Sequence, residues 1–367
     1  MLIQFKTHLL SFGAISYSRS RELLYDYARC CDVTERKRSS CDMGMALLLL
    51  TAVILLGITA ASRLHMLTNS DLSAISKSLS IHTGRPYTAA VKSFIGSGGS
   101  GMQTGLLCDS GGGSEVEFFF KSSSKLSGHS ALLGEFRGIE EIYSTKTIRV
   151  PRPVALLQND VNSFAIFEKI SFNGASNGKL MARQLAAMHS VTSTTYGFHT
   201  NNTIGATFQP NTPSQSWADF YVESRLKHVL QLCKIKGADL GGREPALCSK
   251  VHAALRRHEE QGLRPSLLHG DLWSGNWGWT DDGPVIFDCS CYYGDSEVDL
   301  AMMSLFGSPP GGFTQEYARL MPLRGDSGGF ERRKSMYNLY HMLNHFVLFG
   351  GSYLQSSLRM VDSILSF

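Results

Sequence analysis

Cysteine is sparse in this sequence: the 367 residues include eight, and no two of them form a C-x-x-C pair. Neither a disulfide framework nor a thiolate zinc site is expected, because both need paired or regularly spaced cysteines. Cys289 and Cys291, which flank one serine, are interpreted as small reduced residues in a packed loop. The formal net charge is only +4 and no basic stripe is present, which excludes a nucleic-acid partner from the expected functions.

Internal repeats are also absent, and low-complexity sequence is confined to short glycine runs. The hydrophobic content of 43% and the charged content of 18% are typical of a folded protein rather than a disordered one. At ~100–200 residues per domain, the length predicts two lobes and an additional segment.

A hydrophobic run near the N-terminus stands apart from the rest of the chain. Residues 43–62, MGMALLLLTAVILLGITAAS, carry no charge and match the ~20 residues that a helix needs to cross a bilayer. Arg36, Lys37 and Arg38 precede the run, which suits either a signal sequence or the cytosolic flank of an anchor. The alternative is a buried core helix. We expect residues 43–62 to target the protein or to associate it with a membrane.

Short β-type runs alternate with turns between residues 71 and 170. Strands are predicted over 91–95, 102–108, 116–121, 154–157 and 164–167, and helices over 71–78, with Asp71 as the cap, and over 132–143. Further along, helical spacing dominates, with predicted helices over 179–189, 216–232, 248–261 and 331–349. The order predicts an α+β protein with an antiparallel-sheet N-lobe and a mainly helical C-lobe.

The densest polar motif lies at residues 269–276, where His269-Gly-Asp271-Leu-Trp-Ser-Gly-Asn276 has the spacing H-x-D-x-x-x-x-N. An apolar run then leads to Asp288, twelve residues after Asn276. Phosphoryl transfer needs a carboxylate that orients the attacking hydroxyl and accepts its proton, and oxygen ligands that hold Mg²⁺ on the nucleotide phosphates. We therefore predict Asp271 as the catalytic base, and Asn276 and Asp288 as ligands of Mg²⁺. An aspartate-rich surface loop would rarely reproduce this order.

The N-terminal half offers the matching features of an ATP site. Glycines between two predicted strands would let backbone amides approach phosphate oxygens; those predicted to do so are Gly98, Gly99 and Gly101. The hinge between the lobes is expected where the strand predicted over 164–167 ends. Its main-chain N–H and C=O groups would hydrogen-bond to the edge of the adenine ring. The hinge residues predicted to bind ATP are Phe167, Glu168 and Ile170.

Lys121 ends the third predicted strand, and Glu135 lies on the helix that follows. Their order matches the lysine–glutamate ion pair that positions the α- and β-phosphates in kinases. Lys125 is an alternative to Lys121 in this ion pair, and Glu140 is an alternative to Glu135. We favour Lys121 because strand alternation fixes its direction, and Glu135 because the apolar face of its helix leaves it beside that strand.

Longer stretches of the chain resemble the fructosamine kinase family over about residues 71–365. The resemblance is carried by LLHGDLWSGN, by PVIFDCSCYYGDSEVDLAM, by NLYHMLNHFVLFGGSYL and by the middle stretch from RQLAAMHS to WADFYVESRL. Trp273 in the catalytic loop, the segment 202–205 and the run from Trp217 to Arg225 separate this family from aminoglycoside and choline kinases.

The resemblance implies a bilobal protein-kinase-like fold and transfer of the ATP γ-phosphate to the 3-hydroxyl of a ketosamine, such as ribulosamine or fructosamine. The ketosamine would be carried by a protein lysine or by a free amine. Candidate substrate contacts are Trp273, Trp217 and His269, and the resemblance implies that Asp299 braces the catalytic loop. Some relatives carry cysteine in the glycine loop, where this chain has Ser100 and Met102, so a thiol switch is not expected there.

These interpretations divide the chain into an extension over 1–63, a nucleotide-binding N-lobe over 64–170 and a catalytic, substrate-binding C-lobe over 171–367. An ATP-using enzyme is expected in an ATP-containing compartment, either the cytoplasm or a plastid-type organelle. Two other functions stay open. One is a small-molecule hydroxyl kinase of the aminoglycoside or choline type, and the other is a catalytically inactive, membrane-associated binding protein.

Overall fold

The computed structural model describes residues 67–97, 102–124, 126–323 and 327–367. The predicted signal or anchor segment, residues 43–62, lies outside the described residues, and so do Gly98, Gly99 and Gly101 of the predicted phosphate loop. Within the described ranges, no helix combines the length and the apolar character that a membrane span requires.

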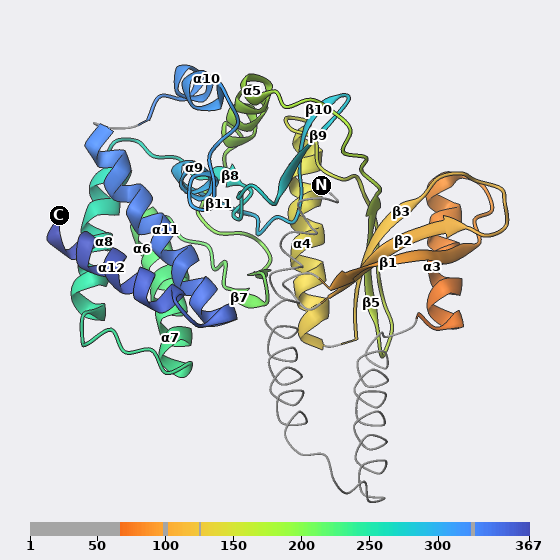
Figure 1. The fold of residues 1–367 in the computed structure, drawn as a ribbon, viewed down its shortest axis with the longest axis horizontal. Helices are drawn as coiled ribbons and strands as arrows, with labels where there is room; N and C mark the ends of the chain where they lie inside the picture. Colours follow the sequence, from red (N-terminus) through yellow and green to blue (C-terminus); the bar gives the residue numbers. More distant parts are fainter. Residues whose placement is uncertain (1–66, 98–101, 125, 324–326) are drawn as a thin grey trace, which may run out of the picture. The chain divides into compact units, whose positions relative to one another are not determined.

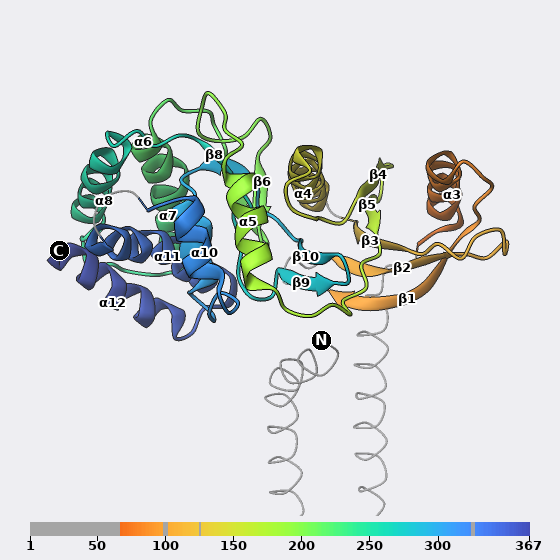
Figure 2. The same cartoon turned by 90° about the horizontal axis from the view of Figure 1, so that it is seen from above.

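The N-lobe is built on the predicted antiparallel sheet, with strand order β1-β2-β3-β5-β4. Its strands are β1 (Ala89–Ser97), β2 (Gln103–Asp109), β3 (Phe118–Ser123), β4 (Pro153–Gln158) and β5 (Ser163–Glu168). Its helices are α3 (Asn69–Thr83) and α4 (Leu126–Thr145), and α4 begins earlier than the apolar spacing predicted. Figure 2 shows β4 and β5 between the two helices.

Strand alternation divides the side chains of β3 and β5 between the two helices. Phe118, Phe120 and Ile166 pack in the cluster beneath α3, whereas Ala165 belongs to the larger core that includes the buried face of α4. Lys121 has the opposite parity to Phe120 and pairs with Ala165 across the strands, so it faces α4. The predicted direction of Lys121 is therefore confirmed.

Helix α3 is tied to the sheet through its first turn. The Thr68 hydroxyl accepts the Asp71 N–H, and the Asp71 carboxylate accepts the Thr68 N–H at 2.8 Å, which together form a capping box. The same buried carboxylate accepts side-chain N–H groups of Asn159 at 2.6 Å and Asn162 at 2.9 Å. Asp71 thus joins the start of the described body to the β4–β5 turn.

The C-lobe is mainly helical, as predicted, and Figure 1 shows its helices on the side of α4 that faces away from the sheet. Its helices are α5 (Gly178–His189), α6 (Trp217–Tyr221), the π-helix η1 (Val222–Lys227), α7 (His228–Ile235), α8 (Glu244–Glu259), α9 (Glu297–Met303), α10 (Phe313–Leu320), α11 (Ser327–Phe349) and α12 (Tyr353–Ser366). Its strands form the pairs β6 (Asn202–Ile204) with β7 (Thr207–Gln209), β8 (Ser266–Leu268) with β11 (Tyr292–Gly294), and β9 (Trp277–Thr280) with β10 (Gly283–Ile286).

The predicted helix over 216–232 is present, but its middle is the wider turn of η1. Arg225 lies in this turn with its guanidinium over the rings of Phe220 and Tyr292, at 4.7 Å and 4.1 Å from their centroids. The guanidinium also donates to the Pro210 carbonyl and to Asn211 Oδ1. Arg225 therefore fastens the helix to the inside of the C-lobe.

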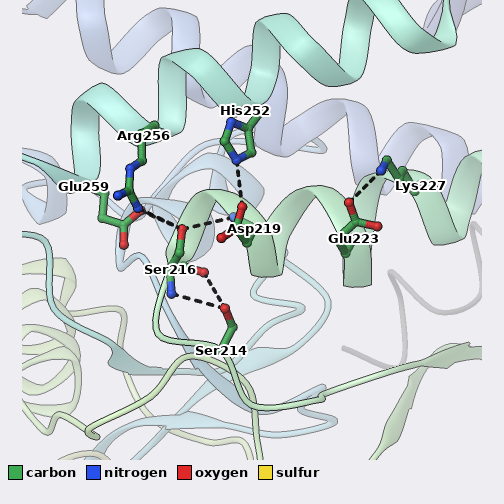
Figure 3. A network of polar contacts seen from close by, with 8 residues as sticks. All are labelled: Ser214, Ser216, Asp219, Glu223, Lys227, His252, Arg256 and Glu259. Carbon is green, nitrogen blue, oxygen red and sulfur yellow. Dashed lines mark hydrogen bonds and ion pairs between the residues drawn. The ribbon is translucent and has the colours of Figure 1, made fainter.

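The outer face of the same helix is joined to α8 by polar contacts, shown in Figure 3. His252 Nε2 lies 2.8 Å from Asp219 Oδ1, and the Ser216 hydroxyl donates to Glu259 at 3.0 Å. Next to these contacts is an open hollow of about 790 Å³. Two of the charged groups that line it, Glu223 and Lys227, pair with one another.

A buried ionic network lies at the base of α9. Arg333 donates to both carboxylate oxygens of Glu297, at 2.7 and 2.8 Å, and His258 Nε2 lies 3.0 Å from Asp295 Oδ2. Burial opposes ionisation of Asp295, but the hydrogen bonds from His258 and Tyr337 outweigh it and lower its pKa. His258, Asp295 and Glu297 are close enough to hold an ion. Because Arg333 already engages Glu297, we interpret the group as a closed ion-pair network.

Candidate active site

Lys121 is held between two carboxylates that come from different lobes. Its Nζ donates to Glu135 Oε1 of α4 at 2.6 Å and to Asp288 Oδ1 at 2.8 Å, and the lysine side chain is only 11% exposed. The rival Glu140 pairs instead with Arg137, and the rival Lys125 lies outside the described residues. Burial alone would lower the pKa of Lys121, but the charges of Asp288 and Glu135 outweigh it and raise the pKa. Lys121 is therefore a cation at the boundary between the lobes.

Asp288 reaches Lys121 from an unusual backbone conformation. Its φ of 60° lies in the left-handed region, which aspartate tolerates better than most residues but which still costs energy. The side chain is 50% exposed, so one face of the carboxylate remains open to a ligand while the other meets Lys121. The structure thus places Asp288 where a carboxylate can serve the lysine and a second partner.

The loop between β8 and β9, which carries the predicted catalytic motif, is held by Asp299 of α9. The Asp299 carboxylate accepts the backbone N–H of His269 at 2.7 Å and that of Gly270 at 2.9 Å. Gly270 has a φ of 81°, and a Cβ there would lie 2.2 Å from the Ser290 carbonyl oxygen, so only glycine fits. Asp299 thus has the bracing contact that the resemblance implied.

Two residues predicted as substrate contacts lie inside the protein. His269 is fully buried; its Nε2–H donates to the Phe287 carbonyl at 2.9 Å and its Nδ1 accepts the Asp271 N–H at 3.2 Å. Burial lowers the pKa of His269 and favours this neutral form. Trp217 is also fully buried, and its Nε1–H donates to the Tyr337 hydroxyl at 3.1 Å. We therefore assign both residues to the support of the site rather than to contact with substrate.

Asp271 and Asn276 lie together, as the motif spacing predicted. The Asn276 side-chain N–H donates to the Asp271 main-chain oxygen at 2.8 Å and to Asp271 Oδ2 at 3.2 Å. It also lies 3.4 Å from the Asp288 main-chain oxygen, so the three predicted polar residues form one cluster. Burial raises the pKa of the Asp271 carboxyl, and the nearby charge of Asp288 raises it further.

The residues present suit a magnesium ion. Because the Asn276 nitrogen makes the hydrogen bonds, the amide presents its oxygen as a donor, and Asp288 offers the open face of its carboxylate. Amide and carboxylate oxygens are the hard donors that Mg²⁺ prefers. Bound there with a nucleotide, the ion would neutralise charge on the phosphate oxygens.

At the hinge, the predicted side chains have structural partners. Phe167 is buried with its ring centroid 5.5 Å from that of Phe136, and Glu168 pairs with Arg149 at 2.9 Å. Ile170 is partly exposed just beyond the end of β5. The Glu168 main-chain N–H donates to the Arg152 carbonyl at 2.9 Å, so nucleotide binding by the main chain of this segment stays a prediction.

Sequence reasoning missed the contacts between aromatic side chains beside Asp288 and Trp273. Phe172 packs on Phe287, the residue before Asp288, with ring centroids 5.4 Å apart. The partly exposed Trp273 packs edge-on against Phe306, whose ring lies 4.6 Å from that of His345. Phe306 and His345 come from distant parts of the chain, so no local pattern joined them to the catalytic loop.

The chain matches known proteins over this whole body. The sequence model of the family described as fructosamine kinase matches residues 72–367. A protein of Synechocystis named probable ketoamine kinase is 38% identical over 296 residues, which cover 79% of this chain and 96% of that protein. A chloroplastic protein-ribulosamine 3-kinase of Arabidopsis thaliana is 38% identical over 256 residues, or 67% of this chain and 76% of the relative.

Solved structures of similar fold include a member of the same family. A crystal structure from Haemophilus somnus, assigned as a fructosamine-3-kinase, superposes with a TM-score of 0.68 at 27% identity and covers 79% of this chain and 96% of its own. The streptomycin–ATP complex of the aminoglycoside phosphotransferase APH(2")-IIa superposes with a TM-score of 0.51 at 14% identity, covering 79% of this chain and 95% of that one. The second likeness concerns the fold alone.

Proposed function

The chain belongs to the fructosamine kinase family, and from this premise we propose that it transfers the γ-phosphoryl group of ATP to the 3-hydroxyl of a ketosamine. The substrates proposed are ribulosamine and fructosamine groups on protein lysines or on free amines. The observation that carries the proposal is the 38% identity to a probable ketoamine kinase, because the match extends over 96% of that relative's length.

The residues of the site have separate roles in this reaction. Asp271 orients the 3-hydroxyl and accepts its proton as the oxygen attacks the γ-phosphorus. Lys121, held by Glu135, binds phosphate oxygens of ATP, and Asn276 and Asp288 hold Mg²⁺. The partly exposed ring of Trp273, two residues after Asp271, offers a surface for the sugar or its amine.

The product explains why such a reaction reverses glycation. A phosphate on C3 is a leaving group on the carbon next to the C2 carbonyl. Loss of a proton from C1 converts the phosphoketosamine to its 1,2-enaminol, whose nitrogen lone pair expels inorganic phosphate from C3 and leaves an imine at C1. The remaining carbonyl fragment then separates from the amine by hydrolysis, and the free lysine is recovered. The protein itself needs to supply only the phosphoryl transfer.

The test is a panel of acceptors incubated with ATP and Mg²⁺, with ADP formation and phosphorylated product both measured. We expect turnover of ribulosamine and fructosamine derivatives, followed by release of phosphate and free amine. Phosphorylation of choline or an aminoglycoside, with no turnover of any ketosamine, would assign the other small-molecule kinase function. No ATP consumption with any acceptor would favour a binding protein.

For the extension we propose a targeting or anchoring role, supported by the uncharged run 43–62 after Arg36-Lys37-Arg38. The chloroplastic assignment of the Arabidopsis relative supports a plastid-type compartment that contains ATP. Imaging of the full chain with a C-terminal fluorescent tag tests the proposal. Diffuse cytosolic signal, unchanged when residues 1–63 are removed, would contradict it.

A further inference from the structure

We propose that Gly134 and Gly138 are positioning residues of the phosphoryl-transfer site, because they let α4 rest directly on the C-lobe and so hold Glu135 against Lys121. The proposal deepens the proposed function and rests on it, since it concerns the lysine that is to bind ATP. Figures 1 and 2 show α4 between the sheet and the C-lobe.

Gly134 and Gly138 lie one helical turn apart on the same face of α4, and each is buried. A Cβ on Gly134 would lie 2.6 Å from Asn202 Cβ and 2.7 Å from Asn202 Cα. A Cβ on Gly138 would lie 2.7 Å from Cys291 Cβ and 2.8 Å from Cys289 Sγ. Any larger side chain must therefore push α4 away from the C-lobe.

The next turn of the helix continues the contact with a hydrogen bond. Tyr293 donates its hydroxyl to Glu141 Oε1 at 2.7 Å, and residue 141 follows Gly134 and Gly138 on one helical face. Gly134, Gly138 and Glu141 of α4 thus each contact the C-lobe. Contact along this length fixes the rotation of the helix about its axis as well as its distance.

The surface beneath α4 is itself one hydrogen-bonded unit, which we call the platform and define as residues 202–204 and 289–293. The Asn202 side chain donates to the Cys291 carbonyl at 2.7 Å, and the Ser290 hydroxyl donates to the Thr203 carbonyl at 2.8 Å. Gln209 of β7 supports the unit by donating to Asn202 Oδ1 at 2.9 Å.

The second segment of the platform, residues 289–293, begins directly after Asp288, and Glu135 follows Gly134 in α4. The positions of both carboxylates that hold Lys121 therefore depend on the platform. The lysine itself comes from β3, which belongs to the sheet. Close seating of α4 on the platform brings Glu135 within 2.6 Å of Lys121 while Asp288 lies within 2.8 Å of it.

The competing explanation is that the sheet alone positions α4, since Leu132, Phe136 and Ile139 are buried in the core on its apolar side. In that case the two glycines only fill space and their effect would be one of general stability. The experiment must separate a change in stability from a change in the Lys121–Glu135 pair.

The test compares Gly138→Ala with wild type by ATP affinity, by KM for ATP and by thermal melting. We expect the ATP affinity to fall roughly tenfold or more, the loss typical when a hydrogen bond to a charged group is broken. The exposed neighbour Arg137→Ala is the matched control and should bind ATP as wild type does.

Two further variants identify the cause. Cys289→Ala with Cys291→Gly removes both atoms that the new Cβ would meet, so adding this pair to Gly138→Ala should restore ATP affinity, with the pair alone as its control. In a Glu135→Gln background, Gly138→Ala should cause little additional loss of ATP affinity, because the contact it displaces is already weakened.

Equal ATP affinity in wild type and Gly138→Ala would overturn the proposal, and so would an additive loss in the Glu135→Gln background. If Gly138→Ala fails to fold, the triple variant with Cys289→Ala and Cys291→Gly should fold again, because the clash with the new Cβ is removed. A triple variant that stays unfolded would also count against the proposal. The failure of the proposed function looks different, because the wild-type protein itself would then phosphorylate no ketosamine, whatever the effect of Gly138→Ala on ATP affinity.

Discussion

Asp299 lies 30 residues after His269 in the chain, yet its carboxylate accepts the His269 backbone N–H at 2.7 Å. The same carboxylate lies 3.1 Å from His189 Nε2, and the side chains of Asp299 and His189 are fully buried. This contact joins α9 and α5 to the first residue of the catalytic motif. The position of Asp271 therefore depends on a residue that touches no substrate.

Asp299→Asn should lower kcat on the order of 10²-fold, because one oxygen acceptor is replaced by an N–H group that faces backbone donors and the loop must shift. KM for ATP should change little, since Lys121 and Glu135 lie on other elements. Steady-state kinetics with a ketosamine acceptor provide the measurement. A variant with wild-type kcat would show that the loop holds its position without the brace.

The same residue gives a prediction for the pH dependence of stability. Burial opposes ionisation of Asp299, but His189 and the His269 backbone N–H outweigh it and lower its pKa. A lowered pKa in the folded state contributes stability that is present above the unfolded-state pKa of about 3.9 and is lost as the pH falls below it. Urea unfolding of wild type should therefore lose free energy as the pH falls below about 4, and the loss should be smaller in Asp299→Asn. Equal slopes in both proteins would contradict this.

Arg333→Met should destabilise the C-lobe by about 3–5 kcal/mol, because it leaves the buried Glu297 carboxylate without its bidentate partner. Burial raises the pKa of Glu297, and Arg333 is one of the groups that oppose this rise. Chemical denaturation at neutral pH measures the effect. Arg319→Met, which removes an exposed partner of Glu316, is the control and should change the unfolding free energy little.

A chain that begins at Leu67 should fold and bind ATP without the preceding residues. The capping box of Thr68 and Asp71 stabilises the first turn of α3, and the hydrogen bonds from Asn159 and Asn162 hold that turn to the sheet. Circular dichroism and ATP titration of the shortened chain check this. Insolubility, or loss of ATP binding that the full chain retains, would place the boundary elsewhere.

Local sequence patterns were enough to predict the antiparallel sheet, the helical C-lobe and the polar cluster of Asp271, Asn276 and Asp288. They succeeded there because strand alternation and motif spacing act over short stretches of chain. They could not distinguish a buried indole from an exposed one, so Trp217 was taken for a substrate contact. Nor could they reveal Phe306 beside Trp273, because tertiary packing alone brings those two segments together.

The final prediction separates the two aspartates of the site. Asp271→Asn keeps the shape of the side chain but removes its charge and most of its basicity, and a positioned general base contributes ~10²–10⁴-fold to the rate. We expect a loss of that order in single-turnover phosphorylation, with ATP affinity near that of wild type. Asp288→Asn also removes the negative charge that faces Lys121 and weakens a ligand proposed for Mg²⁺, so it should weaken ATP binding as well as the rate.

Titration with magnesium distinguishes the two losses further. Raising the Mg²⁺ concentration should partly restore Asp288→Asn, because mass action can offset a weakened ion site, but it should leave Asp271→Asn unchanged, because no ion replaces a base. ATP affinity and single-turnover rates across a magnesium series are the measurements. Near-normal turnover in Asp271→Asn would refute the assignment of the base. Equal ATP affinities in the two variants at every Mg²⁺ concentration would remove Asp288 from the proposed ion site.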